Sequence, residues 1–416
     1  MKEILVYANW KELSELQLMG VLRAEMTKAE EVFSFEYSSQ WLNGGFAQDI
    51  DPDLKLYQGP QYLKDEKPNF GLFLDSSPDR WGRLLMRRRE AIKARERGKR
   101  PIQLFESDFL LGVHDETRMG GLRFKLNVHD EFLESNQGLK VPPMTSVREL
   151  EQASLRIEDD NFFEDKNARK WLNLLIGPGS SLGGARPKAN VRETDGSLWI
   201  AKFPSKNDDK DSGIWEFLVN RMAKNIGIAV AEAKAARFSQ RQHTFLSRRF
   251  DRSITRERIH FASAMTLLGY KDGYSHKGGG SYLEIAELIE RFGASPDRDL
   301  IELWRRIVFS VGVSNTDDHL RNHGFLLTCK GWTLSPAYDI NPDQAGIGLS
   351  LNISEHDNSL DFNLCLEVAE FFRWSLKEAK SYINTVENEI SQWHVRAKQL
   401  QIPTSQINYM ESAFVR

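Results

Sequence analysis

The chain has 416 residues, of which 40% are hydrophobic and 28% charged, so it can form two or three compact units with ordinary cores. A net charge of −3 and a pI near 6.4 give no general reason for the whole surface to bind nucleic acid. The two cysteines stand far apart and no run approaches 18 apolar residues, which excludes a disulfide framework, a zinc knuckle and a membrane span and favours a cytoplasmic location.

Changes in composition and pattern predict three regions, residues 1–125, 126–250 and 251–416. In the first region, Glu3–Ala8 and Glu31–Tyr37 are typical of strands, and a helix should begin near Asp79. This region is therefore expected to mix short strands with at least one helix.

The segment from Arg80 to Arg100 is strongly basic, with ten Lys or Arg residues against two Glu residues. Charge runs on a helix are usually solvated faces, and the interleaved Leu84, Leu85 and Ile92 predict that one side packs inward. Direct contact with nucleic acid, mostly alongside a partner protein, stays open as the alternative.

The second region opens with a polar connector through residue 145. Ser146 and Glu149 follow in the spacing of a capping box, which predicts the start of a helix. Further on, Gly177–Ala185 is a glycine-rich loop, and its backbone N–H groups can approach phosphates without obstruction by side chains. The loop is not a Walker A sequence, and a plain turn or linker is the alternative.

A hairpin is expected directly after the glycine-rich loop. Lys188–Glu193 and Ser197–Phe203 alternate around Asp195-Gly196, which is a signal for a two-residue turn. Lys202 lies on the second strand, on the face of an apolar neighbour, so its ammonium group projects from an apolar surface near the loop. This is the place expected of a phosphate-binding lysine.

A helix starting at Ser212 should follow the hairpin and bury one apolar stripe, with Glu216 at the edge of that stripe. A phosphate-binding lysine commonly needs a carboxylate to hold its head group, and Glu216 is the candidate for Lys202. The alternative is a lysine that reaches solvent and a glutamate that lies at the surface.

The third region is predominantly helical and carries the most informative pattern. Residues 297–313 have apolar side chains at every third or fourth position, which predicts a helix that ends just before a loop containing Asp317 and Asn322. Two short apolar runs after this loop predict a hairpin that leads to Asp339. Because antiparallel strands bring their outer ends together, Asn322 and Asp339 should converge.

These residue types suit phosphoryl transfer. Two oxygen ligands at the end of one hairpin can hold Mg²⁺ between nucleotide phosphates, while a loop Asp accepts the proton of a hydroxyl group. Asp and Asn also build turns, so a purely structural role is the first alternative. His319 and His323 beside the acidic pair raise a second one, a metal-dependent hydrolase, but neither H-x-H nor H-E-x-x-H spacing is present.

Several motifs resemble those of the HipA toxin kinases in their residues, order and spacing. They are D-R-W-G-R at 79–83, S-L-G-G-A-R-P-K at 181–188, I-A-K-F-P at 200–204, R-F-D-R at 249–252, N-T-D-D-H-L-R-N at 315–322 and Y-D at 338–339. The resemblance covers most of the chain, and its most specific part is the loop of Asp317 and Asn322 with the Tyr-Asp pair that follows.

The resemblance implies an α+β, two-lobed protein-kinase-like fold that is distantly similar to lipid kinases. The N-terminal lobe would be mixed α/β over 126–250, with an extra N-terminal subdomain over 1–125, and the C-terminal lobe would be mainly helical over 251–416. The implied activity is that of a serine/threonine protein kinase that uses ATP and Mg²⁺ and belongs to a toxin–antitoxin system.

On the same resemblance, Asp317 is the catalytic base, and Asn322 and Asp339 bind Mg²⁺ and the nucleotide. The further ATP-binding residues that it implies are Ser181, Leu182, Gly183, Gly184, Ala185, Lys188, Lys202, Glu216, Arg248 and Phe250. Backbone groups near Arg248 and Phe250 would hold the adenine.

Members of this family phosphorylate a serine in their own glycine-rich loop, and this modification silences the enzyme. Ser181 matches that serine, with Ser180 as the adjacent candidate, and a dianion there would repel ATP phosphates. The sequence departs from the best-known member at Arg186 and Pro187, where that member has a Gln-Glu pair. Pro187 removes one N–H donor and stiffens the loop exit, so the regulation implied by the resemblance is less secure than the catalysis.

The implied partners are a small helix-turn-helix antitoxin, operator DNA reached mainly through that antitoxin, and a protein substrate, for which aminoacyl-tRNA synthetases are a target class of the family. Two other classes of function stay open. One is a small-molecule phosphotransferase that uses the same site, and the other is a catalytically silent module that binds the antitoxin and DNA.

Overall fold

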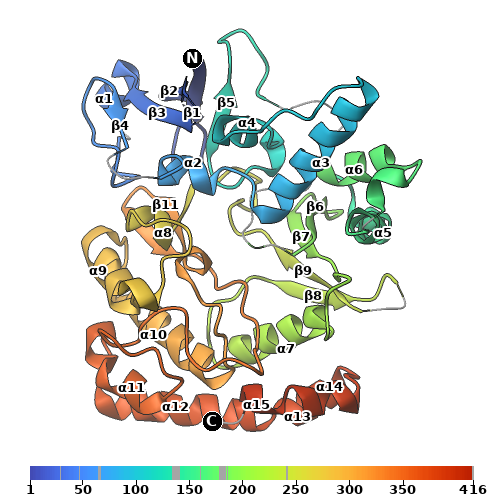
Figure 1. Ribbon diagram of the computed structural model, residues 1–416. Helices are drawn as coiled ribbons and strands as arrows, with labels where there is room; N and C mark the ends of the chain where they lie inside the picture. The colour runs from blue at the N-terminus through green and yellow to red at the C-terminus, as the bar shows by residue number, and fades with distance from the viewer. Residues whose placement is uncertain are drawn as a thin grey trace. The chain divides into compact units, whose positions relative to one another are not determined.

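The computed structural model divides into two compact units, which are treated separately (Figure 1). Unit 1 comprises residues 1–207 and 248–262, and unit 2 comprises residues 208–247 and 263–416. The residues described are 1–28, 30–45, 47–63, 67–133, 141–159, 161–177, 184, 186–239 and 242–414. The predicted division into 1–125, 126–250 and 251–416 remains a prediction, because the two compact units group the chain by spatial contacts and do not test those boundaries.

Unit 1 contains an antiparallel five-stranded sheet in the order β4-β3-β2-β1-β5. Its strands are β1 (Lys2–Ala8), β2 (Gln17–Thr27), β3 (Glu30–Tyr37), β4 (Gln61–Tyr62) and β5 (Leu122–Lys125). The strands expected at β1 and β3 are confirmed, and their alternating burial puts one face of the sheet into the core. The long strand β2, which joins them, was not singled out from the sequence.

Helices pack around this sheet and beyond it. They are α1 (Ser39–Asn43), α2 (Gly71–Asp75), α3 (Arg80–Glu96), α4 (Glu106–Leu111), α5 (Val147–Ile157) and α6 (Ala168–Ile176). The helix expected near Asp79 is α3, and the Asp79 side chain caps it by accepting a hydrogen bond from the Gly82 amide at 2.7 Å. Leu85 is buried, as expected of the inward side, and Figure 1 shows α3 beside α6.

The capping box predicted at Ser146 is wrong, although a helix does begin there. The chain enters α5 through a short 3-10 turn, so Ser146 has φ −84° and ψ −3° in place of the extended backbone that an N-cap needs. Its side chain accordingly makes no capping hydrogen bond.

The hairpin after the glycine-rich loop is confirmed. It consists of β6 (Lys188–Arg192) and β7 (Leu198–Lys202), with Lys188 paired to Lys202. The connection is longer than the two-residue turn expected, because the Glu193 amide donates to the Ser197 carbonyl and leaves three residues in the loop. Gly196 closes this loop at φ +83°, a conformation that favours glycine.

Unit 2 is mainly helical, as predicted for the end of the chain. Its helices are α7 (Ser212–Asn225), α8 (Ala264–Leu267), α9 (Tyr282–Phe292), α10 (Pro296–Gly312), α11 (Phe362–Glu367), α12 (Leu376–Ser391), α13 (Trp393–Gln399), α14 (Thr404–Tyr409) and α15 (Glu411–Phe414). Two antiparallel hairpins accompany them, β8 (Ala233–Ala236) with β9 (Thr244–Arg248) and β11 (Gly324–Thr328) with β12 (Gly331–Leu334). Strand β10 (Phe261–Ser263) precedes α8.

Helix α10 is the centre of the core of unit 2 and confirms the helix expected at 297–313. Its apolar side chains are almost fully buried, and the ring of Trp304 packs against those of Trp374 and Tyr382. Removing each such side chain from water contributes roughly 1.5–3 kcal/mol. Helix α12, drawn in red in Figure 1, contacts both α10 and α7. The loop that follows α10 is thus attached to a deeply buried helix of unit 2.

Within the described part of the chain, none of the helices combines the length and the apolarity that crossing a membrane requires.

Candidate functional site

The loop after α10, residues 315–323, is anchored at its first residues by side-chain hydrogen bonds. Ser314 has φ +51°, and its Oγ donates to the carbonyl of Ala413 at 3.0 Å, which turns the chain out of the helix. The Oδ1 of Asn315 accepts from the Asn341 amide at 3.0 Å, and the Nδ2 of Asn315 donates to Ser310 Oγ at 3.2 Å. These buried bonds fix where the loop begins.

Thr316 is held from two further segments. Its Oγ1 donates to Asp343 Oδ2 at 2.8 Å, and its carbonyl accepts from Ser350 Oγ at 2.8 Å. Gly346 lies so close that a Cβ on it would come within 2.2 Å of the Thr316 side chain, so only glycine fits there. The segment after Asp339 therefore packs directly on the residue that precedes Asp317.

Asp317 has an exposed side chain on a well-fixed backbone. Its carbonyl accepts hydrogen bonds from the His319 amide and from Asn322 Nδ2, both at 2.9 Å. A carboxylate that is accessible while its main chain cannot shift is suited to accept a proton from a substrate hydroxyl group.

Asn322 presents one oxygen for a cation. Its Nδ2 is bound to the Asp317 carbonyl, and within the described residues no hydrogen bond reaches its Oδ1. Asn322 is 7% exposed, so this amide lies at the edge of the interior. Oxygen ligands of this kind are the ones that Mg²⁺ prefers.

Asp339 is brought to the same loop by the hairpin β11–β12. The hydroxyl group of Tyr338 donates to the Arg321 carbonyl at 2.6 Å, so the segments that carry Asn322 and Asp339 meet. Asp339 itself has φ +58°, and its Oδ1 accepts from Asn341 Nδ2 at 2.9 Å. Where the sequence is described, no three His, Cys, Asp or Glu side chains cluster as a closed metal site.

In unit 1, the ends of the glycine-rich loop are anchored on the N-terminal part of the chain. The Nζ of Lys188 lies 2.9 Å from Asp79 Oδ2, and both side chains are at most 3% exposed. Trp81 Nε1 donates to the Lys188 carbonyl at 3.0 Å, and Thr117 Oγ1 donates to the Gly177 carbonyl at 3.3 Å. Lys188 was predicted to bind ATP, and the structure places it in this buried ion pair.

Five other predicted residues of the glycine-rich loop lie outside the described residues, and they are Ser180, Ser181, Leu182, Gly183 and Ala185. Gly184 is described, with φ +88° and with the Lys188 ammonium close to it, so a Cβ would be both strained and crowded. Lys202 is half-buried at the end of β7 in unit 1, and Glu216 is 5% exposed on α7 in unit 2. Their pairing remains a prediction.

Arg248 and Phe250, the predicted adenine-binding positions, are half-buried and frame a charged cluster that the sequence did not reveal. Between and after them, Arg249 and Arg252 each contact Asp251 Oδ2 at 2.6 Å. Burial opposes ionisation of Asp251, but the two guanidinium groups outweigh it and hold the pKa of the carboxyl group well below its usual range. The sequence offered no local signal that these charges are buried.

The same cluster ties the segment 248–262 to the rest of unit 1. Arg249 Nη1 donates to the Thr117 carbonyl at 2.7 Å and to Asn190 Oδ1 at 2.8 Å. Arg252 donates to the carbonyls of Glu116 and Arg118. The short turn 116–118 thus supports both this segment and, through Thr117, the start of the glycine-rich loop.

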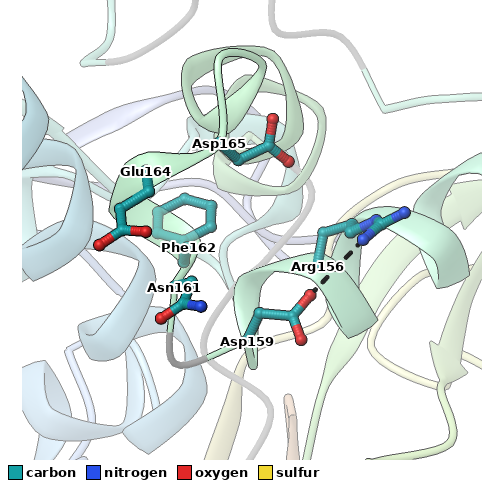
Figure 2. A pocket seen from close by; sticks show the side chains of 6 residues that line it. All are labelled: Arg156, Asp159, Asn161, Phe162, Glu164 and Asp165. Atoms are coloured by element: carbon teal, nitrogen blue, oxygen red, sulfur yellow. Dashed lines mark ion pairs between the residues drawn. The ribbon is translucent and has the colours of Figure 1, made fainter.

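A separate cavity of about 510 Å³ lies between the end of α5 and the start of α6 (Figure 2). It is lined by Arg156, Asp159, Asn161, Phe162, Glu164 and Asp165. The carboxylates are partly engaged, since Asp159 lies 3.8 Å from Arg156 and Asp165 accepts from Trp171 Nε1 at 3.0 Å. None of the predicted site residues lines this cavity, and acidic side chains alone do not define a ligand.

Residues 180–394, just over half of the chain, match the family model described as the HipA-like C-terminal domain. The chain belongs to this family. The resemblance seen in the sequence motifs is thereby confirmed. The matched range contains residues 180–185 of the glycine-rich loop, Lys202 and the segment from Asp317 to Asp339.

Individual relatives agree with this assignment. The chain is 28% identical over 331 residues to the candidate kinase Y4mE of Sinorhizobium fredii. This match covers 71% of Y4mE and 74% of this chain. Its fold matches HipA of Shewanella oneidensis MR-1, solved in complex with HipB and operator DNA, with a TM-score of 0.68 at 18% identity. That match covers 98% of this chain and 94% of HipA and confirms the predicted α+β fold class. The match to the Helicobacter pylori kinase CtkA, at a TM-score of 0.34 and 14% identity over 52% of this chain and 95% of CtkA, is too weak for an argument.

Proposed function

We propose that this member of the HipA-like family is an ATP- and Mg²⁺-dependent serine/threonine protein kinase that acts as the toxin of a toxin–antitoxin pair. The observation that carries the proposal is the loop after α10. An exposed Asp317 carboxylate stands on a fixed backbone, and the oxygens of Asn322 and Asp339 are attached to the same hydrogen-bonded framework. Phosphoryl transfer needs these parts in these positions, a base for the hydroxyl group and oxygen ligands for the metal.

The proposed roles follow this division. Asp317 accepts the proton of the substrate hydroxyl group, while Asn322 and Asp339 bind Mg²⁺, which neutralises charge that develops on the phosphates. Lys202 contributes a phosphate-binding ammonium group, and Glu216 is proposed to orient it. Backbone groups near Arg248 and Phe250 hold the adenine, and the backbone of residues 181–185 approaches the phosphates, together with Lys188.

Autophosphorylation of Ser181, or of the adjacent Ser180, is proposed as the switch that silences the enzyme. A phosphoserine carries a charge of about −1.5 to −2, which repels the phosphates of ATP from the same loop. The protein target is proposed to be an aminoacyl-tRNA synthetase, the target class that the family resemblance implies.

The partners are proposed from the same family. The Shewanella relative was solved with HipB and operator DNA, which supports a small helix-turn-helix antitoxin for this chain and contact with operator DNA mainly through it. A cytoplasmic location is proposed with these partners, and it agrees with free cysteines at Cys329 and Cys365.

Replacement of the proposed base tests the assignment most directly. Incubated with Mg²⁺ and labelled ATP, the purified chain should label itself, and Asp317→Asn should lower the rate by about 100-fold to 10,000-fold because the base is lost. Asp297→Asn is the matched control, since Asp297 is also an exposed aspartate of unit 2 but its carboxylate pairs with Arg373. Equal labelling by Asp317→Asn and Asp297→Asn would remove Asp317 from its role.

The same assay separates the proposal from its alternatives. ATP consumption that needs a soluble metabolite and labels no protein would indicate a small-molecule phosphotransferase. Absence of ATP binding and consumption under all conditions would indicate a silent module that only binds an antitoxin and DNA.

A further inference from the structure

Asp318, the residue next to the proposed base, points in the opposite direction. Asp317 is exposed, whereas Asp318 is 5% exposed and its carboxylate lies inside unit 2. The tight turn between the Asp317 carbonyl and the His319 amide produces this reversal. Two adjacent acidic residues thus have separate environments, and only one of them can meet a substrate.

Three side chains from three parts of unit 2 surround the Asp318 carboxylate. The hydroxyl group of Tyr282, at the start of α9, donates to Asp318 Oδ2 at 2.7 Å. Ser310 Oγ, on α10, donates to the same oxygen at 3.3 Å. His323 Nε2 lies 3.1 Å from Asp318 Oδ1. The histidine that suggested a metal site is therefore engaged inside the protein.

The surrounding groups are themselves fixed. Tyr282 is fully buried, its amide donates to the Asn352 carbonyl at 3.0 Å, and its ring stands edge-on to the ring of His323 with centroids 5.5 Å apart. The His323 carbonyl accepts from the Ala264 amide at 2.8 Å. The Asp318 carboxylate is therefore an anchor set into a rigid frame that spans α8, α9 and α10.

A buried carboxylate adds little to the stability of a fold, because the free energy lost on its desolvation offsets much of what its contacts contribute. An apolar residue at position 318 would fill the same space without that loss. Asp318 lies next to the proposed base, so its directional hydrogen bonds can hold the backbone of that loop in one conformation. Side chains that orient a functional group through a second layer of hydrogen bonds act in this manner.

We infer that Asp318 and Tyr282 are positioning residues for the proposed kinase reaction, an inference that rests on the proposed function. The Tyr282 hydroxyl group holds Asp318 inward, and this fixes the adjacent Asp317 backbone so that its carboxylate faces the reacting hydroxyl group. Neither residue touches nucleotide or substrate in this role. The residues that do so are Asp317, Asn322 and Asp339.

Tyr282→Phe tests the inference because it removes only the hydroxyl group. With kinase activity as readout, kcat should fall by about 10-fold to 100-fold while KM for ATP changes by less than about 2-fold, since positioning affects the transition state and not nucleotide binding. Tyr382→Phe is the matched control, because that hydroxyl group is also buried in unit 2 and donates to a backbone carbonyl, Ile226, at 3.2 Å.

A second measurement does not need activity. Backbone amides of residues 316–323 should exchange hydrogen faster in Tyr282→Phe than in wild type or Tyr382→Phe, because the anchor of the loop is loosened. Asp318→Asn provides a rescue series, since an amide oxygen still accepts from Tyr282. It should therefore lose less kcat than Asp318→Ala.

The outcomes separate the two ideas. If wild type and Tyr382→Phe consume no ATP, the proposed function fails, and the exchange measurement alone decides the inference. If wild type is active but Tyr282→Phe matches Tyr382→Phe in both kcat and exchange, the inference is overturned. A rise in KM with unchanged kcat, or equal losses in Asp318→Asn and Asp318→Ala, would also overturn it.

Discussion

The residues that flank the glycine-rich loop in unit 1 and the Asp317 loop in unit 2 are held in place by different kinds of interaction. The stem of the first depends on a buried ion pair, Lys188 with Asp79, which joins residues far apart in the sequence. The second depends mainly on separate hydrogen bonds, such as that from Thr316 to the Asp343 carboxylate and that from Asn322 to the Asp317 carbonyl within the loop. Its one buried charge, Asp318, lies behind the loop.

The two kinds of interaction should fail in different ways. Loss of one partner from a buried ion pair leaves an uncompensated charge in the interior, so the stem of the glycine-rich loop should respond to single substitutions almost as an all-or-none element. A network of separate hydrogen bonds loses its parts one at a time, at about 1 kcal/mol each. The Asp317 loop should therefore respond gradually in stability, although its geometry is more demanding for catalysis.

The largest effect on stability is expected from Lys188→Met. Asp79 would remain buried without its partner, and the free energy of unfolding should fall by about 3–5 kcal/mol. The double variant Asp79→Asn with Lys188→Met removes both charges, while the Asn side chain can still cap α3, so it should recover a large part of the loss. Denaturant titration of the four chains measures this, and additive losses would contradict the pairing.

A smaller effect, dependent on pH, is expected from His260 in unit 1. Burial lowers the pKa of His260 to about 3, and its ring is stacked on Trp10 with centroids 4.7 Å apart. The unfolded chain, with an ordinary histidine pKa near ~6.5, takes up the proton first as the pH falls. Stability should therefore decline from about pH 6.5 downward, by on the order of 3 kcal/mol at pH 4.

The control for this decline is His260→Gln, which keeps a side-chain acceptor where the Gly121 amide donates to His260 Nδ1 at 3.4 Å. Without a titrating ring, the dependence of unfolding free energy on pH should be flatter between pH 4 and 6.5. Parallel pH curves for wild type and His260→Gln would show that the histidine does not titrate on unfolding.

The smallest effect on stability is expected from Thr316→Val in the Asp317 loop. The substitution removes the hydrogen bond to Asp343 and should lower the free energy of unfolding by about 1 kcal/mol. Thr385→Val, which removes the bond of an exposed threonine to the Ser381 carbonyl on α12, should cost less. A loss of several kcal/mol in Thr316→Val would show that the hydrogen bonds of the loop do not break one at a time.

The sequence predicted the elements around the candidate site because their signals are local. The apolar period of α10 and the alternation of β11 and β12 place Asn322 before the first strand and Asp339 after the second strand of one hairpin. Both residues are therefore expected at the open end of that hairpin before any packing is known. The turn after β6 was predicted too short, because the extra loop residue depends on the left-handed backbone of Gly196 and not on the strand pattern. Capping at Ser146 failed for a similar reason, since its backbone angles depend on the preceding turn.

Other features depend on residues that meet only in the fold. No local pattern pairs Lys188 with Asp79, and none reveals that Arg249, Asp251 and Arg252 form a buried cluster with the turn at 116–118. Their charges suggest a solvated surface when read in sequence order. Burial of such groups requires partners from distant segments, which the tertiary structure supplies.

The helix, loop and hairpin that carry the acidic motif can be predicted from the amino-acid order, because side-chain periodicity and turn preferences act over a few neighbouring residues. The opposite orientations of Asp317, which faces outward, and of Asp318, which turns toward Tyr282 and Ser310, become visible only in the folded chain. Two adjacent aspartates are equivalent in sequence. They differ in the fold because the side chains able to compensate one buried carboxylate come from α9 and α10, and those helices reach it only once the core of unit 2 has formed.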